Sequence, residues 1–387
     1  MTIREIKESI SAFQDKNSFD YERKDCEELN RLFFPSPESF EIIRSEHKDR
    51  FYLMPASGRI PLLYRGQSRE IIPCLPTLYR GNPSELKIFA DRMRLVEFEC
   101  LLESHPLVRH FKSLGMSVDA EGLAQHYGIN TEILDFSSDI DIALFFAMCP
   151  YDSSTDEYRL PDESKGLKGI VYVVNPLFYD PQAFNGNTID MFRGIVEPIG
   201  LQPFERPAVQ KGYGIRLSNR KPLQHVAVFD LEYTMDQARG YYENFAQNTK
   251  LWVKDELIAP TKNLLNKSTF HPWIFKEAWD RYPISGLTKS QCKKKLECEC
   301  GIFLNRDAEI RDFSTIVISE SMLEERWNSY IKRIVSRKVM DIDSSDNTVN
   351  ERTPFMTTQL IAHMEMLRIV GSGRTYPEGV RPCEKVR

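Results

Sequence analysis

The amino-acid sequence predicts an α+β protein with a small mixed or antiparallel sheet flanked by helices, and with helical extensions at both ends. Two patterns support this fold class. Short runs rich in β-branched and aromatic residues, such as GIVYVV, are typical of strands. Longer segments in which apolar residues recur every three or four positions are typical of amphipathic helices. Of the 387 residues, 41% are hydrophobic and 28% are charged, so a packed globular core is expected.

The N-terminal part, residues 1–58, is predicted to be a helical extension. It opens with MTIREIKESISAFQ, which has the pattern of an amphipathic helix, and the proline-containing FFPSPESF interrupts the pattern. The segment RIPLLYRG then forms a short strand that ends at Gly66. Residues 84–113 are predicted to be helical, because their apolar residues fall near a helical period.

The middle of the chain alternates between helical and strand patterns. VDAEGLAQHYG is predicted to be a helix, and Gly128 is a suitable residue to end it. The apolar residues 139–148 fit a helix or a strand, because so short a run does not distinguish the two. A polar surface loop follows at residues 151–166. The strand candidates after it are GIVYVVNP, HVAVFDLEY and FSTIVIS.

The last third of the chain is predicted to be mostly helical. TKSQCKKKLECECGI forms one short helix ending at Gly301. Its three cysteines have no second Cys or His pair at ligand spacing, so we expect packing rather than a metal site. In EERWNSYIKRIVSRKVM, a solvated basic face is favoured over nucleic-acid contact, which stays open. A final helix at 353–370 and a loose tail complete the chain.

Charge and hydropathy restrict the classes of function. The net charge of −5 argues against attraction of the whole surface to nucleic acid or to an anionic membrane. No run approaches the roughly 18 apolar residues of a membrane span, and the N-terminal segment lacks the apolar core of a signal peptide. We therefore expect a cytoplasmic protein without a membrane partner, whose eight cysteines are free thiols.

The first candidate site residues lie at the end of the strand that stops at Gly66. They are Tyr64, Arg65, Gly66 and Gln67. An arginine offers a rigid fork of donors suited to phosphate or carboxylate, and a glycine lets another backbone or a ligand approach closely. The alternative for Arg65 is a structural ion pair with an acidic residue of the 84–113 helix, such as Glu99 or Glu103.

The second group of candidates lies in QHYGINTEILD. Gln125, His126, Tyr127, Thr131 and Asp135 place an amide, an imidazole, a phenol, a hydroxyl and a carboxylate in one short segment. A histidine beside a carboxylate is suited to carry or donate a proton. The alternative is a satisfied, buried polar network that fixes the turn. The density of polar residue types before an apolar run favours a site.

These segments resemble a known family. YRGQ, the following Pro-Cys-Leu-Pro with Arg80, QHYGINTEILDFS and IALFFA together resemble the FRG domain, named for its Phe/Tyr-Arg-Gly motif. ERPAVQKGYG, which contains Arg206 and Gln210, is similar to the Arg…Gln-x-Gly segment of that family, and TKSQCKKKLECECGI is similar to its closing helix. The resemblance covers about 60–235 and, more weakly, 285–312.

The resemblance implies an α+β domain found in prokaryotic and phage proteins. We expect this domain at residues 59–320, with an insertion at about 236–285. Residues 323–387 would form a helical C-terminal extension with a loose tail.

Two hypotheses of function remain open from the sequence. The first is an NAD-consuming enzyme like the ADP-ribosyltransferases, whose cores often begin with an aromatic-Arg-Gly strand. Arg65 and Arg206 would bind the anionic ligand, and Tyr64 or Tyr127 would stack on nicotinamide. His126, Asp135 and Gln210 would be catalytic, with Asp135 stabilising an oxocarbenium-like centre. The Ser-Thr-Ser strand and the Glu-x-Glu pair of those enzymes have no counterpart here.

The second hypothesis is a non-catalytic module that binds an anionic ligand or a phage component. Its C-terminal helices, including Trp327 and residues 353–370, would contact a protein partner. FRG-like proteins often resemble parts of phage-defence or toxin systems, and that setting suits either hypothesis.

Overall fold

The computed structural model describes the larger part of the chain. The described residues are 1–17, 40–44, 51–55, 62–113, 118–152, 155, 157–174, 196–224, 226–248, 251–253, 255–310, 312–313, 319–333, 337–340 and 380–382. The FSTIVIS segment and the predicted final helix at 353–370 fall largely or wholly outside them.

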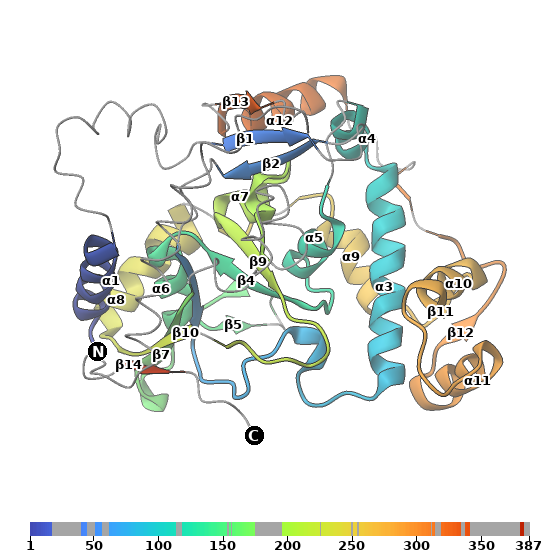
Figure 1. Cartoon of the computed structure of the whole chain (residues 1–387), viewed down its shortest axis with the longest axis horizontal. Coiled ribbons are helices and arrows are strands. Elements are labelled where there is room, and N and C mark those ends of the chain that lie inside the picture. The colour runs from blue at the N-terminus through green and yellow to red at the C-terminus, as the bar shows by residue number, and fades with distance from the viewer. Residues whose placement is uncertain are drawn as a thin grey trace, which may run out of the picture.

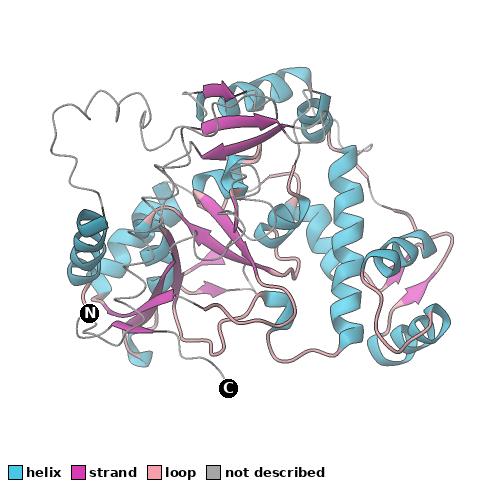
Figure 2. Cartoon of the chain, viewed as in Figure 1, coloured by secondary structure: helices cyan, strands magenta, loops and turns pink. Residues whose placement is uncertain are grey.

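The centre of the molecule is a seven-stranded sheet of order β14-β10-β7-β3-β4-β9-β8 (Figures 1 and 2). Every pair of neighbours in it is antiparallel, so the predicted sheet type is confirmed. Its strands in chain order are β3 (Leu63–Gln67), β4 (Ile133–Ser137), β7 (Lys168–Val174), β8 (Val196–Glu197), β9 (Gly212–Arg216), β10 (Val226–Glu232) and β14 (Val380–Pro382).

One face of this sheet is covered by helix α6 (Ile140–Met148), which begins at the capping residue Asp139. The helix lies unusually close to the strands. A Cβ on Gly66 would come within 1.7 Å of the Ala143 carbonyl oxygen, and a Cβ on Gly169 within 2.4 Å of that of Ala147. The apolar run at 139–148 is therefore a helix, and its small residues meet glycines of β3 and β7.

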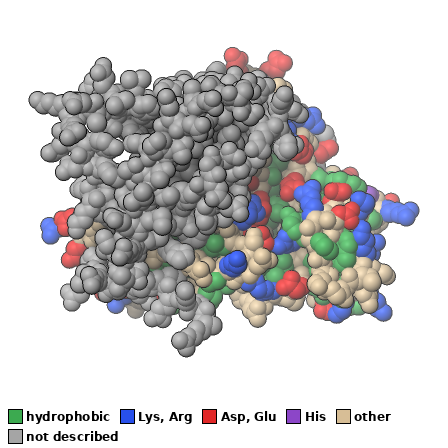
Figure 3. Space-filling view, viewed as in Figure 1, with side chains coloured by type: hydrophobic (Ala, Val, Ile, Leu, Met, Phe, Trp, Pro, Cys, Tyr) green, Lys and Arg blue, Asp and Glu red, His purple; other side chains and the backbone are tan. Residues whose placement is uncertain are grey.

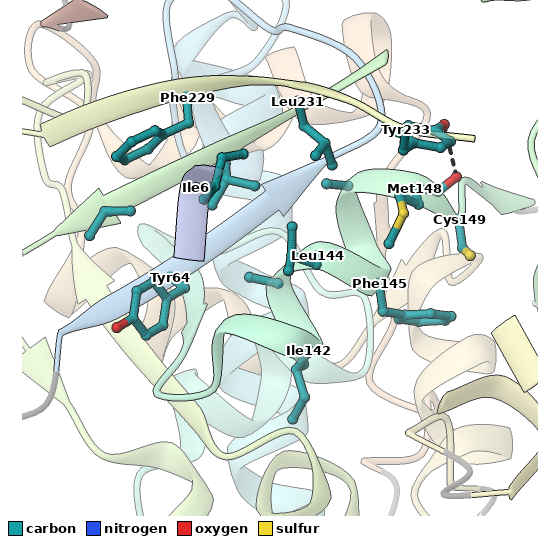
Figure 4. Packing of buried hydrophobic residues seen from close by; sticks show 14 of the residues in the cluster. Ile6, Tyr64, Ile142, Leu144, Phe145, Met148, Cys149, Phe229, Leu231 and Tyr233 are labelled. Carbon is teal, nitrogen blue, oxygen red and sulfur yellow. Dashed lines mark hydrogen bonds between the residues drawn. The ribbon is translucent and has the colours of Figure 1, made fainter. Parts of the chain in front are cut away.

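Two further helices complete the core on that face. They are α1 (Ile3–Asn17), which contributes Ile6, and α8 (Met235–Tyr242). Figure 4 shows Ile6, Leu144 and Phe229 in this shared core, with Tyr64 from β3 near Ile6. The burial of these apolar side chains supplies the main driving force for the docking of α6.

A second layer of helices packs around the long helix α3 (Glu85–Ser104), at the right of Figure 1. One apolar cluster joins it to α4, α5 and α9, and another joins it to α10 and α11. The bounds of these elements are α4 (Pro106–Ser113), α5 (Ala120–His126), α7 (Glu205–Val209), α9 (Ile258–Leu265), α10 (Pro272–Arg281), α11 (Lys289–Cys300) and α12 (Glu320–Arg333).

The smaller elements lie around this frame. A three-stranded sheet has the order β13-β1-β2, and two pairs of short strands, β5–β6 and β11–β12, are separate from it. The bounds are β1 (Phe40–Arg44), β2 (Phe51–Pro55), β5 (Tyr151–Asp152), β6 (Glu157–Tyr158), β11 (Thr269–Phe270), β12 (Phe303–Leu304) and β13 (Arg337–Met340). Short 3₁₀ helices are at Thr77–Tyr79, Glu163–Lys165 and Ile199–Leu201, and Glu243–Asn248 is a π-helix.

Several local predictions are wrong. Strands β1 and β2 lie inside the segment expected to be helical, where FEIIR and FYLMP pair antiparallel with each other. Their β-branched and aromatic residues favour strands. Pro106 divides the expected 84–113 helix in two, since proline is suited to the first position of a new helix. The C-terminal tail, expected to be loose, contributes β14 to the sheet edge.

Candidate functional site

The candidate site begins where strands β3 and β4 separate. The two strands have a single register pair, Tyr64↔Ser137. Two residues further back along β4, the main-chain oxygen of Asp135 accepts a hydrogen bond from Arg65 Nη1 at 2.7 Å. The arginine side chain thus replaces a ladder hydrogen bond between the strands. The alternative of an ion pair with Glu99 or Glu103 is wrong, because those carboxylates pair with Arg281 and Lys112.

Helix α5 brings Gln125 to the Asp135 side chain. The amide Nε2 of Gln125 donates to Asp135 Oδ2 at 3.2 Å. Its Oε1 accepts from the hydroxyl of Thr131 at 2.6 Å and from that of Thr77 at 3.2 Å. These two hydroxyls fix which way the amide points, so one carboxylate oxygen of Asp135 is held by a donor in a set position.

His126 is the last residue of α5 and is only 6% exposed. Burial lowers its pKa, and the nearby Arg206 acts in the same direction, while the Asp135 charge and the nearby Gln210 side chain oppose them. The imidazole is therefore neutral at pH 7. Its Nε2 is buried without a hydrogen-bond partner among the described residues. Gly212 makes room for the ring, since a Cβ there would lie 3.2 Å from Nε2.

Two more buried polar atoms at this point lack a partner within the described chain. They are Asp135 Oδ1 and Arg65 Nε. Buried polar groups in folded proteins nearly always have a hydrogen-bond partner, and an unmet one costs about 1–3 kcal/mol. The cluster formed by Arg65, Gln125, His126 and Asp135, here called the central cluster, therefore offers unused donors and acceptors to a small polar molecule.

Aromatic side chains lie against the central cluster. The guanidinium of Arg206 stacks 3.6 Å from the centre of the Trp252 ring, and its Nη1 donates to the His126 main-chain oxygen at 3.2 Å. The Tyr158 ring, from the β5–β6 hairpin, is 5.5 Å from that of Trp252. Burial raises the pKa of Tyr158, and the Asp135 charge adds to the effect. A flat ring system and a cation thus border the polar atoms.

The remaining predicted residues serve mainly in packing. Tyr64 belongs to the core beneath α6, and burial raises its pKa to about 12. The sequence left open whether another backbone or a ligand approaches Gly66. The close neighbour is the backbone of α6. Gln67 is buried, and its Oε1 lacks a partner among the described atoms.

Tyr127 and Gln210 are also tied into the interior. The Tyr127 hydroxyl donates to Asp255 Oδ2 at 2.5 Å, and its ring lies 5.1 Å from the Arg206 guanidinium. Gln210 donates from Nε2 to the main-chain oxygen of Leu251 at 2.9 Å. Its side chain lies close to the His126 ring. Gln210 and Asp135 therefore both lie near the His126 ring, and Arg65 bonds the main chain of Asp135.

Comparison with known families identifies the domain. A model of the FRG domain matches residues 61–156. The chain contains an FRG domain. The match spans the central cluster and α6, whereas Arg206 and Trp252 lie beyond it. Neither the comparison with curated proteins nor that with solved structures finds a match.

The FRG motif residues have two separate roles in this domain. The glycine of Tyr-Arg-Gly and the alanines of IALFFA form one packing contact between β3 and α6. The arginine crosses to β4 and joins the polar cluster. One short motif therefore couples the packing of the sheet to the placement of the site.

The sequence interpretation missed three residues near the central cluster. Tyr158 lies in a segment expected to be a polar loop, and Trp252 lies in the proposed insertion. Neither has a local signal, because only the tertiary fold brings them to Arg206. Arg80 is part of the motif that resembles the FRG domain, but it was not among the predicted site residues. Its side chain lies beside Arg65 and Cys74.

Two further features concern the described part of the chain alone. It holds no group of three His, Cys, Asp or Glu side chains arranged for a metal ion. Its helices are all too short or too polar to cross a membrane. On the face shown in Figure 3, charges of both signs are interspersed over the described surface.

Proposed function

We propose that the FRG domain binds a nucleotide at the central cluster. Asp135 and His126 would hold the ribose hydroxyls, and Arg65 would lie on the phosphate side. The observation that carries the proposal is the pair of buried atoms, Asp135 Oδ1 and His126 Nε2, that have no partner in the described chain and lie beside a guanidinium.

The chemistry of these groups suits a ribose. A carboxylate only accepts hydrogen bonds, whereas a neutral imidazole has one donor and one acceptor nitrogen. Each hydroxyl of a vicinal diol both donates and accepts, so the two groups complement it. A carboxylate holding ribose hydroxyls is a common device in nucleotide-binding folds. The Trp252 and Tyr158 rings, which meet edge to face, supply an aromatic surface for a base.

Binding is tested with a panel of adenosine, ADP and NAD in isothermal titration calorimetry. Asp135→Asn keeps the shape and removes the charge, so we expect nucleotide affinity to fall at least about tenfold. Asp91→Asn is the matched control, because both oxygens of Asp91 have partners, Arg94 and Asn130. If no nucleotide binds the wild-type protein, or if both variants bind like wild type, the proposal is wrong.

A second candidate function is cleavage of NAD by the same cluster, in a cytoplasmic effector of a defence or toxin system. The observation in its favour is again Asp135 Oδ1, a carboxylate oxygen suited to stabilise an oxocarbenium-like centre. This hypothesis predicts release of nicotinamide, lost in Arg65→Ala and His126→Ala at unchanged melting temperature. It also predicts growth arrest on expression, relieved by the Arg65 change. Binding of NAD without its cleavage would rule out this second function and support a non-catalytic binding module.

A further inference from the structure

Two arginines of the FRG domain reach the same short segment, Arg65 at Cys74 and Arg80 at Leu75, and neither has a carboxylate partner within the described residues. Arg65 donates from Nη1 to the Asp135 main-chain oxygen, and Arg80 donates from Nε to the Leu75 main-chain oxygen at 2.9 Å. Both side chains are half-buried. Burial lowers the pKa of Arg80, and repulsion by Arg65 is the next largest cause. Main-chain oxygens orient the two guanidinium groups but carry no net charge.

The other half-buried arginines of the described chain are neutralised differently. Arg92 pairs with Glu132 at 2.6 Å, Arg94 with Asp91 at 2.8 Å, and Arg220 with Glu85 at 2.8 Å. Arg216 and Arg326 also have carboxylate partners. Within the described residues, no ion pair includes Arg65 or Arg80. Asp135 acts on Arg80 from a distance, and one carboxylate leaves one positive charge in excess.

We propose that Arg65 and Arg80 together bind a phosphate or diphosphate group, which supplies the missing negative charge. The inference rests on the proposed nucleotide function and assigns its phosphate subsite, with Arg80 as the second arm. A guanidinium keeps its charge at any physiological pH, so the protein cannot relieve the repulsion by losing a proton. Its planar fork of donors matches phosphate oxygens, and two such forks suit a diphosphate.

The test measures binding of inorganic pyrophosphate and inorganic phosphate to the full chain by calorimetry and by thermal shift. We expect pyrophosphate to bind the wild-type protein and to raise its melting temperature. Arg80→Gln should weaken this binding at least about tenfold, and Arg80→Lys should restore part of it. Arg220→Gln is the control, because Arg220 is half-buried near the same loop but already has Glu85. It should bind pyrophosphate like wild type.

A ligand-free measurement guards against variants that merely misfold. At low ionic strength, Arg80→Gln should keep or raise the melting temperature, because it removes a like-charge contact. Arg220→Gln should lower it, because it breaks an ion pair. A wild-type protein that ignores millimolar pyrophosphate would overturn the inference. So would an Arg80→Gln protein that binds pyrophosphate as tightly as wild type.

Adenosine and ADP separate this inference from the proposed function. If pyrophosphate binds through Arg80 but neither nucleoside nor nucleotide does, the phosphate subsite stands and the nucleotide proposal fails. If adenosine and ADP bind equally well and Arg80→Gln changes neither, the nucleotide proposal stands and the phosphate subsite is wrong.

Discussion

Two polar clusters flank helix α5, and they carry opposite excess charge. At the N-terminal end, Asp119 caps the helix through a hydrogen bond from Gly122 N at 3.0 Å. There, Glu121 and Glu197 both pair with the one cation Arg216. At the C-terminal end lies the central cluster, where Arg65 bonds the Asp135 main-chain oxygen and the Asp135 carboxylate acts on the nearby Arg80. One end has a surplus of carboxyl groups, and the other has a surplus of guanidinium groups.

The two ends of α5 neutralise their excess charge in different ways. A carboxyl group can bind a proton, and the environment of Asp119 favours this. Burial raises its pKa well above the usual range, and the neighbouring Glu197 adds to the effect. An arginine has no such route, because its charge persists. The acidic cluster can therefore neutralise itself with solvent protons, whereas the cationic end needs an anion from outside the protein.

The largest expected effect comes from removing the cation of the acidic cluster. Arg216→Met leaves Glu121 and Glu197 without their partner and should destabilise the fold by about 3 kcal/mol. Arg80→Gln, at the other end, should cost almost nothing. Urea unfolding of the two variants beside the wild-type protein checks the contrast. Equal losses of unfolding free energy in Arg216→Met and Arg80→Gln would show that the two ends of α5 do not differ in how their charges are balanced.

Glu256 lies outside both clusters and extends the comparison, because it has an arginine partner inside the protein. Glu256 accepts from His105 Nε2 at 2.9 Å and pairs with Arg326 of α12. Although burial acts to raise its pKa, these hydrogen bonds hold it at about 2. Its stabilisation is present above the pKa of the unfolded carboxyl and is lost as the pH falls through about 2.

Glu256→Gln should therefore cost about 2 kcal/mol at pH 7 and less as the medium becomes acidic. The measurement is urea unfolding at pH 7 and at pH 3, with the exposed Glu297→Gln as control. A Glu256→Gln protein as stable as wild type at pH 7 would contradict the ion-pair account of α12 docking.

The raised pKa of Asp119 gives a smaller effect with a defined sign. Its folded pKa is raised, so its stabilisation is complete below the pKa of the unfolded carboxyl and is lost as the pH rises through the folded value. Asp119→Asn keeps a capping side chain and cannot release a proton, so we expect a change below about 1 kcal/mol at pH 7. Unfolding measured from pH 4 to pH 9 should show a flatter profile for the variant. An unchanged profile would mean that Asp119 is ionised.

The smallest expected effect concerns His126 at the cationic end. Burial and then Arg206 keep its pKa low, so the ring stays neutral where a free histidine takes up a proton. Its stabilisation is present above the pKa of the unfolded imidazole and is lost as the pH falls through the lower folded value. Nuclear magnetic resonance of the ring should show this low pKa, and a rise when pyrophosphate is added. An ordinary pKa, insensitive to the anion, would contradict the charge arrangement.

Local sequence patterns predict the parts of this molecule that depend on local physics. Gly128 and Gly301 both follow helices and have positive φ, so the expected helix ends are confirmed. Strands β7 and β10 follow their β-branched runs. The residues of the central cluster could be proposed from the sequence because, apart from Arg65, they lie within a dozen residues of one another.

The rest depends on contacts between distant segments. Nothing local shows that Gly66 faces Ala143, or that Tyr158 and Trp252 lie beside Arg206. The strands β1 and β2 were missed because each is short, and because β1 also pairs with β13, which lies almost 300 residues further along the chain. The excess positive charge at Arg65 and Arg80 likewise cannot be predicted from the sequence, because it depends on which carboxylates pair with other cations in the folded protein.

The most direct test of the charge surplus is a crystal structure of the full chain grown with ADP. The account predicts a diphosphate between the Arg65 and Arg80 guanidinium groups, with ribose hydroxyls within hydrogen-bond distance of Asp135 and His126. A structure in which the two arginines instead contact carboxylates of the protein, with no nucleotide beside them, would contradict it.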